Sequence, residues 1–120
     1  MAGLRVTGGG RPLASVRRFE GSAMIRHVVL FGWTAEATAA QVQRVADELL
    51  ALPPLMRGLR SYQLGTDAGL VEGNYDFAIV GDFDDADSFR AYRVHPAHLA
   101  VIEGVIRPIM RARAAVQYEL

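Results

Sequence analysis

The nine residues from Ile25 to Trp33 constrain the fold most, because they predict a strand that is largely apolar on both faces. The segment IRHVVLFGW is rich in β-branched and aromatic residues, which favour extended structure. Alternation with a period of two divides it into two faces: Ile25, His27, Val29, Phe31 and Trp33 on one, and Arg26, Val28 and Leu30 on the other. His27 is the one polar residue of its face. Both faces are therefore expected to be covered by other parts of the protein.

A helix is predicted after this strand. Thr38 and Gln41 match a capping box, in which the two side chains bond to free backbone N–H groups at a helix start. Apolar residues then recur at helical spacing: Val42, Val45, Ala46, Leu49 and Leu52. Pro53 and Pro54 end the helix, because proline disfavours helical geometry in the residue before it.

The rest of the chain alternates again between strand and helix patterns. Strands are predicted at residues 59–65, 75–83 and 112–120, with a loop at 66–74. Asp84, Asp85 and Asp87 suit the first turn of a helix that carries Phe89 and Tyr92. His95 and Pro96 separate this helix from a second one, whose apolar stripe is predicted to be Leu99, Ile102, Val105 and Ile106.

The order of these elements predicts an α+β fold of the ferredoxin-like β-α-β-β-α-β type, with one antiparallel four-stranded sheet. Helices on one side of such a sheet leave the other side bare. We expect the bare face to carry Val29, Phe31, Trp33 and Phe77, which is too much apolar surface for a monomer. A homodimer that packs two such faces together follows from this assignment.

Composition excludes several classes of protein. The 120 residues suit one domain, and no apolar stretch approaches a membrane span. There is no cysteine, which excludes disulfides and thiolate chemistry and is consistent with the cytoplasm. All thirteen basic residues are arginine; residues 24–120 hold nine of them and twelve acids, a balance of −3. This acidic balance argues against nucleic-acid binding.

Residues 1–23 are predicted to be a flexible extension, and residues 24–120 the folded domain. The extension contains Gly8, Gly9 and Gly10 and lacks the apolar stretch of a secretory signal. Met24 would serve as a natural start of the domain.

Three segments of the chain resemble the stress-responsive A/B barrel (Dabb) family. They are the opening strand with its histidine (24–33), the strand 75–83 followed by acidic residues, and Tyr92-Arg-Val-His-Pro-Ala-His98, which resembles the Tyr-x-x-His-Pro-x-His signature. The resemblance covers residues 24–120. It implies a dimeric α/β barrel in which two four-stranded sheets enclose an interior.

The resemblance also implies roles for individual residues. The family includes olivetolic acid cyclase, a polyketide cyclase that performs an aldol closure. Carried over from it, His98 is the catalytic base and Tyr92 assists it, while His27 lies near the pocket. Phe77 replaces another pocket histidine of the cyclase, which puts the substrate in doubt. The predicted substrate-binding residues are His27, Val29, Phe31, Phe77 and Ile79.

The residue types alone are consistent with this chemistry. A neutral imidazole suits proton abstraction at neutral pH, and a phenol can donate to a developing oxyanion, so no cofactor is expected. A structural interpretation stays open for each residue. His95 can cap a helix, His98 can bond to nearby backbone, Tyr92 can be core, and His27 can be a satisfied core histidine.

No metal is expected. His95 and His98 lie three apart without an evident third ligand. The acids at 82, 84, 85 and 87 lack the glycine and final glutamate of a twelve-residue calcium loop, and helix capping explains them. A phosphate loop and a serine nucleophile elbow are also absent from the sequence.

Three functions compete at this point. The first is a dimeric protein that binds an apolar or carbonyl-containing small molecule in a barrel pocket, in a stress-related role without defined catalysis. The second is a cofactor-free cyclase with a histidine base. The third, borrowed from other dimeric α+β barrels, is haem binding or monooxygenase-like oxidation.

Overall fold

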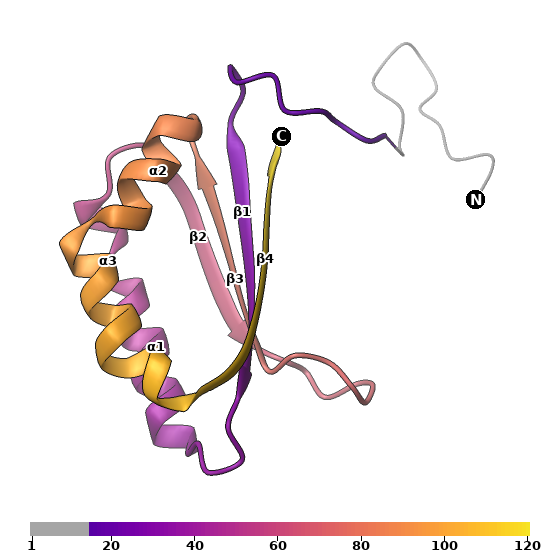
Figure 1. The fold of residues 1–120 in the computed structure, drawn as a ribbon, viewed down its shortest axis with the longest axis vertical. Coiled ribbons are helices and arrows are strands. Elements are labelled where there is room, and N and C mark those ends of the chain that lie inside the picture. Colours follow the sequence, from indigo (N-terminus) through magenta and orange to yellow (C-terminus); the bar gives the residue numbers. More distant parts are fainter. Residues whose placement is uncertain (1–14) are drawn as a thin grey trace.

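A computed structural model describes residues 15–120 of the chain, which form one four-stranded antiparallel sheet with helices on one side (Figure 1). The sheet order is β2-β3-β1-β4. The strands and helices have these bounds: β1 Ile25–Trp33, α1 Ala39–Leu50, β2 Leu59–Thr66, β3 Phe77–Phe83, α2 Ala86–Val94, α3 Pro96–Val101 and β4 Met110–Glu119. Short 3-10 turns cover Pro53–Leu55 and Arg107–Ile109, and a π-helical turn covers Ile102–Ile106.

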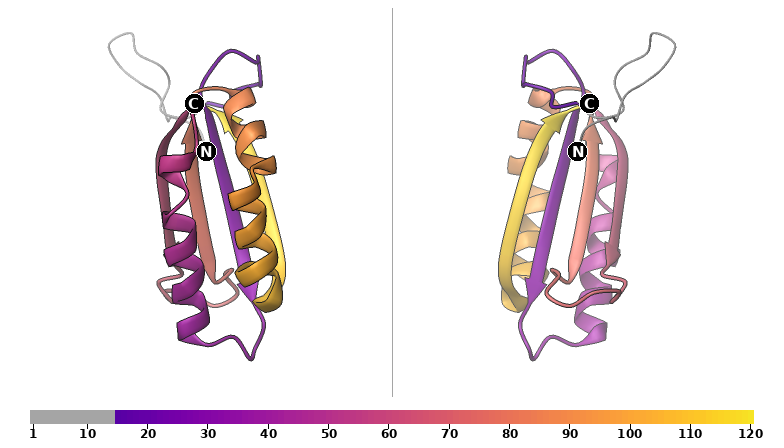
Figure 2. Two further views of the ribbon diagram at one scale, coloured as in Figure 1. Left: turned by 90° about the vertical axis from the view of Figure 1, so that its left-hand side faces the viewer. Right: turned by 90° about the vertical axis from the view of Figure 1, so that its right-hand side faces the viewer.

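This is the ferredoxin-like α+β arrangement that the sequence predicted. Figure 2 shows how the helices divide the covered face between them: α1 lies over the β2 and β3 half, and α2 and α3 lie over the β1 and β4 half. The two groups of helices, α1 and α2 with α3, meet above β1 and β3. Phe31, Leu49 and Phe83 are fully buried there. No helix within residues 15–120 has the length and hydropathy that crossing a bilayer requires.

The predicted helix caps are confirmed. Thr38 Oγ1 accepts from the Gln41 N–H at 3.2 Å, and the Thr38 N–H donates to Gln41 Oε1 at 2.9 Å. Asp85 caps α2 by accepting from the Ser88 N–H at 2.8 Å. These bonds satisfy N–H groups that the first turn of a helix leaves free.

Three of the four strands differ by one or two residues from the sequence prediction: β2 ends at Thr66, β3 begins at Phe77, and β4 covers Met110–Glu119. Strand β3 begins at Phe77 rather than Tyr75. The Asp76 backbone still donates to the Phe31 carbonyl and accepts from the Asp67 N–H, each at 2.8 Å, and its carboxylate accepts the Trp33 N–H at 2.7 Å. The loop before β3 is therefore 67–76. Most of the predicted extension, residues 1–14, lies outside the described residues; residues 15–24 hold no helix or strand.

The prediction of which sheet face is bare is wrong. Val29, Phe31, Trp33 and Phe77 are all buried under the helices. The face without helices, which we call the open face, carries the alternate residues of the strands. Those of β1, β3 and β4 include Arg26, Val28, Leu30, Ala78, Val80, Asp82, Val116 and Tyr118. Alternation in β1 could not decide between two apolar faces. The helices cover the face with the larger aromatic side chains, since this buries more apolar area.

The predicted apolar stripe of the last helix is also partly wrong. Leu99 is exposed, whereas Val101, Val105, Ile106 and Ile109 are buried. Leu99 lies in the short helix α3, before the π-helical turn that begins at Ile102, and Val101 of the same helix is buried in its place.

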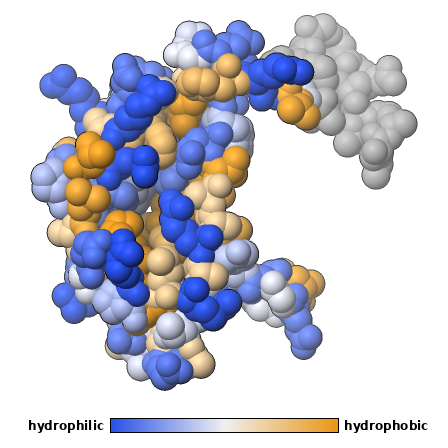
Figure 3. Space-filling model, viewed as in Figure 1, coloured by the Kyte–Doolittle hydropathy of each residue, from blue (hydrophilic) through white to orange (hydrophobic). Residues whose placement is uncertain are grey.

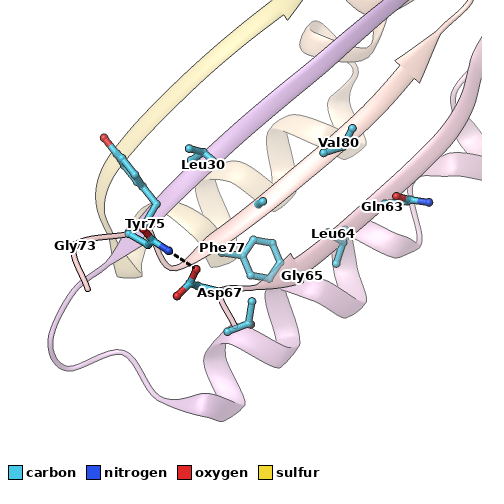
Figure 4. Close-up of a pocket in the computed structure, with 12 residues that line it drawn as sticks. Leu30, Gln63, Leu64, Gly65, Asp67, Gly73, Tyr75, Phe77 and Val80 are labelled. Atoms are coloured by element: carbon cyan, nitrogen blue, oxygen red, sulfur yellow. Dashed lines mark hydrogen bonds between the residues drawn. The ribbon is translucent and has the colours of Figure 1, made fainter. Parts of the chain in front are cut away.

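The open face is hollowed between two projecting segments. Residues 15–24 project from one end of the sheet and the 67–76 loop from the other, both on the side opposite the helices (Figures 1 and 3). A groove of about 650 Å³ lies at the base of this loop, where Leu30, Tyr75 and Val80 contribute to its wall (Figure 4). Asn74 donates to Asp67 at 3.0 Å and closes the loop. The exposed residues of this side include large apolar ones, such as Leu70 and Val116.

Candidate functional site

One row of four residues across the helix-covered face forms the base of the candidate site. The strand registers place Tyr62 beside Gly81, Gly81 beside His27, and His27 beside Gln117. The row therefore crosses the sheet from β2 to β4. Because side chains alternate between faces along each strand, all four positions face the helices.

Gly81 makes room in the middle of this row. A Cβ at Gly81 would lie 3.2 Å from the Tyr62 ring and 3.3 Å from the Phe83 ring, closer than ordinary contact. The glycine therefore makes room for the Tyr62 and Phe83 rings. Tyr92 of α2 packs beside them, with its ring centroid 5.1 Å from Phe83 and 6.0 Å from His27.

A cavity of about 320 Å³ lies next to this row, between the sheet and helices α2 and α3. We call it the helix–sheet cavity. Nine of its lining residues are aliphatic or aromatic: Val29, Phe31, Leu49, Ile79, Phe89, Tyr92, Ile102, Ile106 and Ala115. The other five are polar: His27, Arg93, His98, Arg113 and Gln117. A cavity that combines apolar side chains with placed polar groups is typical of sites for small organic molecules.

His27 is a buried, neutral imidazole with a defined tautomer. The Gln117 amide nitrogen donates to His27 Nδ1 at 2.9 Å, so the ring proton is on Nε2. Burial lowers the pKa of His27 to about 4, and the positive charge of Arg113 acts in the same direction. The ring also packs against Phe89, with centroids 4.7 Å apart. His27 is therefore a neutral hydrogen-bond donor at physiological pH.

His98 has the opposite tautomer. Its Nδ1 lies 3.2 Å from the Arg93 carbonyl oxygen, which can only accept, so the ring proton is on Nδ1 and Nε2 carries the lone pair. Burial lowers the pKa of His98, and the nearby guanidinium groups of Arg93 and Arg113 add to this effect, while the backbone bond opposes it. A lowered pKa keeps the lone pair of Nε2 free at neutral pH. His98 thus has the form that a general base requires.

Tyr92 contacts both His98 of α3 and Tyr62 of β2. Its ring lies 4.2 Å from the His98 ring, and its hydroxyl forms a 2.8 Å hydrogen bond with the Tyr62 hydroxyl. Burial raises the pKa of both phenols, so both stay protonated. When Tyr62 donates in this pair, the Tyr92 proton remains available to another acceptor.

An irregular helical turn follows α3 and closes the cavity on that side. Ile102 and Ile106, the first and last residues of the π-helical turn, both line the cavity. Such turns are found frequently at functional sites, because the wider turn moves side chains out of the regular helical pattern. The irregular turn is thus part of the cavity wall.

The residues predicted for the site come together with one exception. His98, Tyr92, His27, Val29, Phe31 and Ile79 all line the helix–sheet cavity. Phe77 does not: it pairs with Phe31 in the sheet but lies on the side away from β4, packed against Trp33 with ring centroids 5.6 Å apart. The cavity lies mainly above β1 and β4 and includes Ile79 of β3, but not Phe77.

The location of the cavity also differs from the prediction. The sequence pointed to a pocket in the interior between two sheets, because it assigned His27 and its neighbours to the bare face. These side chains instead face the helices of their own chain. Two larger hollows, of about 650 and 970 Å³, lie at the other end of the sheet and contain no histidine. We favour the smaller cavity because two oriented imidazoles line it, and none lines the other two.

The remaining histidine has a structural role. His95 Nδ1 accepts from the Ala97 N–H at 3.0 Å and so caps α3, as the alternative interpretation predicted. Within residues 15–120 no three His, Cys, Asp or Glu side chains are grouped as a metal would require.

Two of the four acids near α2 form ion pairs rather than helix caps. Arg26 makes a bidentate pair with Asp82 at 2.7 and 2.8 Å, and Arg60 pairs with Asp84. Asp85 caps α2, and Asp87 lies in its first turn. Capping therefore explains only part of this acidic cluster.

Sequence reasoning missed the residues that support the site: Tyr62, Phe89, Arg93, Arg113 and Gln117. Tyr62 and Gln117 lie in strands whose pairing partners cannot be read from local patterns. Arg93 carried a signal, since it is part of the signature between Tyr92 and His98. Arg113 and Gln117 lie within the predicted strand 112–120, and the prediction assigned no role to them.

Comparisons with known proteins agree on the fold. The sequence profile of the Stress responsive A/B Barrel Domain family matches residues 25–120. A dimeric ferredoxin-like protein of unknown function from Thermobifida fusca is 45% identical, with a TM-score of 0.77 over 86% of this chain and 95% of that chain. No curated protein matches the chain.

Two more distant structures share the fold alone. A Dabb family protein from Mesorhizobium loti is 20% identical, with a TM-score of 0.69 over 82% of this chain and 97% of that chain. The hydroxynitrile lyase from Passiflora edulis is 16% identical, with a TM-score of 0.72 over 82% of this chain and 94% of that chain. The profile match over 25–120 and the relative at 45% identity settle the classification. This chain belongs to the stress-responsive A/B barrel (Dabb) family.

Proposed function

We propose that each copy of the chain binds a small, largely apolar organic molecule with a carbonyl or similar polar group in its helix–sheet cavity. The observation that carries the proposal is the pair of oriented imidazoles in a cavity that aliphatic and aromatic residues also line: His27 offers an N–H donor and His98 a free lone pair. A carbonyl oxygen could accept from the first, and an acidic C–H or O–H could approach the second. The aliphatic and aromatic walls would bind the rest of the molecule.

Blocking the cavity tests this proposal. Ala115 lines the cavity on β4 and is exposed, so Ala115→Trp fills the space without disturbing the core. Ala91→Trp, at an exposed position of α2 outside the cavity, is the matched control. Native mass spectrometry of the purified proteins, with acetophenone added, is expected to show one ligand per chain for wild type and Ala91→Trp only. Equal binding by Ala115→Trp would place the ligand elsewhere and contradict the proposal.

A second candidate function is cofactor-free catalysis with His98 as base. It is favoured by the tautomer of His98, because the Arg93 carbonyl fixes the proton on Nδ1 and leaves Nε2 basic. Proton abstraction from a carbon next to a carbonyl would leave an enolate oxygen, to which His27 Nε2–H or the Tyr92 hydroxyl could donate. The fold also occurs in a protein named as a hydroxynitrile lyase, whose 16% identity carries no more than the fold.

Hydrogen–deuterium exchange of the acetophenone methyl group, followed by NMR in D₂O, tests the catalytic candidate. We expect exchange above the buffer rate that falls by about 10²-fold or more in His98→Gln. The wild-type rate should rise with pH through a pKa below 6.5 and then level off, because burial lowers the pKa of His98. His95→Asn keeps a capping side chain and is the control. Exchange as fast in His98→Gln as in wild type would remove His98 as the base.

We further propose that two copies associate through their open faces. Val28, Val80 and Val116 lie next to one another on this face without helix cover, and the 45% identical relative is described as dimeric. A central charge should prevent burial of the face. In sedimentation experiments we expect wild type and Val94→Glu, at an exposed site on α2, to have the mass of two chains, and Val80→Glu that of one. A wild-type protein with the mass of one chain would contradict this assembly.

The cytoplasmic location stays a prediction from the sequence.

A further inference from the structure

Two arginines stand at the rim of the helix–sheet cavity. Arg93 belongs to the last turn of α2 and Arg113 to β4, so the two guanidinium groups approach the cavity from the helix layer and from the sheet. Both residues are exposed, whereas His27 is buried. The positive charge therefore lies at the opening and the imidazoles lie deeper.

The charge of these arginines is not balanced by the protein around them. Of the eleven arginines in residues 15–120, six form ion pairs with aspartate or glutamate: Arg26, Arg44, Arg60, Arg90, Arg107 and Arg111. Arg93 and Arg113 form none within this range. Within the same residues, no aspartate or glutamate lines the cavity. The cavity thus has a net positive rim and no internal anion.

The effect of this charge reaches the interior. The guanidinium groups of Arg93 and Arg113 both disfavour the protonated forms of His27 and His98, and so add to the effect of burial on their pKa values. An anion at the rim would offset this repulsion. It would also satisfy two forked donors whose geometry fits a carboxylate.

We propose that the ligand of this cavity is an organic carboxylate, whose anionic head group binds Arg93 and Arg113 while its apolar body enters the cavity. This inference rests on the proposed function, because it specifies the class of molecule that the same cavity binds. The head group stays near solvent at the rim, which limits the cost of burying its charge. The body lies among Phe31, Phe89 and Ile102, within reach of the two imidazoles.

A pair of ligands that differ in charge tests the inference: phenylacetate and its neutral amide, phenylacetamide. Isothermal titration calorimetry of the full chain at pH 7.5 and low salt is expected to give an affinity about tenfold or more higher for phenylacetate. Arg93→Gln and Arg113→Gln should each weaken phenylacetate binding by about three- to tenfold and leave phenylacetamide binding unchanged. Arg90→Gln, also exposed on α2 but paired with Asp87 at 3.0 Å, should alter neither affinity.

The outcomes separate this inference from the proposed function. Equal binding of the acid and the amide, with no effect of either arginine variant, would overturn the carboxylate assignment and leave the cavity as a ligand site. The same loss in Arg90→Gln as in Arg93→Gln would also overturn it, because the effect would then be one of net charge. If neither phenylacetate nor phenylacetamide binds, both proposals are contradicted.

Discussion

Acidification should destabilise this protein well above the pH at which its carboxylates protonate, because His27 is buried in its neutral form. The imidazole is only 4% exposed, and burial lowers its pKa from 6.5 to about 4. The unfolded chain therefore takes up a proton before the folded one does. The contribution of His27 is fully present above pH 6.5, falls as the pH drops, and is lost below about pH 4.

The size of this effect follows from the two pKa values. Their difference corresponds to about 3 kcal/mol over the whole range, of which about 2 kcal/mol is lost between pH 7 and pH 5. The pKa of His98 is also lowered, so it acts in the same direction. The pKa of Asp82 is lowered by its bond from Arg26, so the contribution of that ion pair is lost only below the ordinary carboxylate range.

Urea unfolding of wild type and His27→Gln at pH 7, 6 and 5, at one protein concentration, measures this contribution. His27→Gln can still bond to Gln117 but cannot titrate. We expect the free energy of unfolding of wild type to fall between pH 7 and 5 by about 2 kcal/mol more than that of the variant. Equal slopes for the two proteins would refute the assignment of His27 as a buried neutral histidine.

Three further substitutions test the elements that hold the site, each by thermal or urea unfolding. Thr38→Ala removes the capping box and should lower the free energy of unfolding by about 1 kcal/mol. Gly58→Ala should cost about 1–3 kcal/mol, because Gly58 has a φ of +82° and an added Cβ would collide with the Ser88 side chain. Tyr62→Phe leaves the buried Tyr92 hydroxyl without its partner and should cost about 1 kcal/mol, and a cost within error of zero would show that this bond is not maintained in solution.

The sequence predicted the order of elements and the helix starts because these depend on local patterns. The capping box at Thr38, the cap at Asp85 and the break at His95 each involve residues within a few positions of one another. The strand β1 was equally clear, since nine extended residues with β-branched and aromatic side chains leave few alternatives. Local physics was sufficient for this part of the fold.

The sequence could not decide which face of the sheet the helices cover. Both faces of β1 are apolar, so the choice depends on how well the aromatic set around Phe31 packs against α1, α2 and the last helical turns. The π-helical turn at Ile102 was also hidden, because the residues are compatible with a regular helix. Such properties arise from packing between distant segments rather than from local preference.

The sequence predicted the histidines and the tyrosine of the site, but not the groups that form hydrogen bonds with them. The signature from Tyr92 to His98 identified the chemistry-bearing residues through a resemblance. The bonds that set their tautomers depend on the strand register that brings Gln117 to His27 and on the helix break that brings the Arg93 carbonyl to His98. Neither contact leaves a pattern in the sequence.

The most direct test of the account is to locate a bound molecule relative to the two faces of the sheet. Histidine and methyl resonances of the full chain can be followed by two-dimensional NMR during a titration with acetophenone. We predict that the largest shifts occur at His27, His98 and Val29, in the helix–sheet cavity. Shifts that are largest at Val28 and Val80, on the open face, with both imidazoles unaffected, would contradict it.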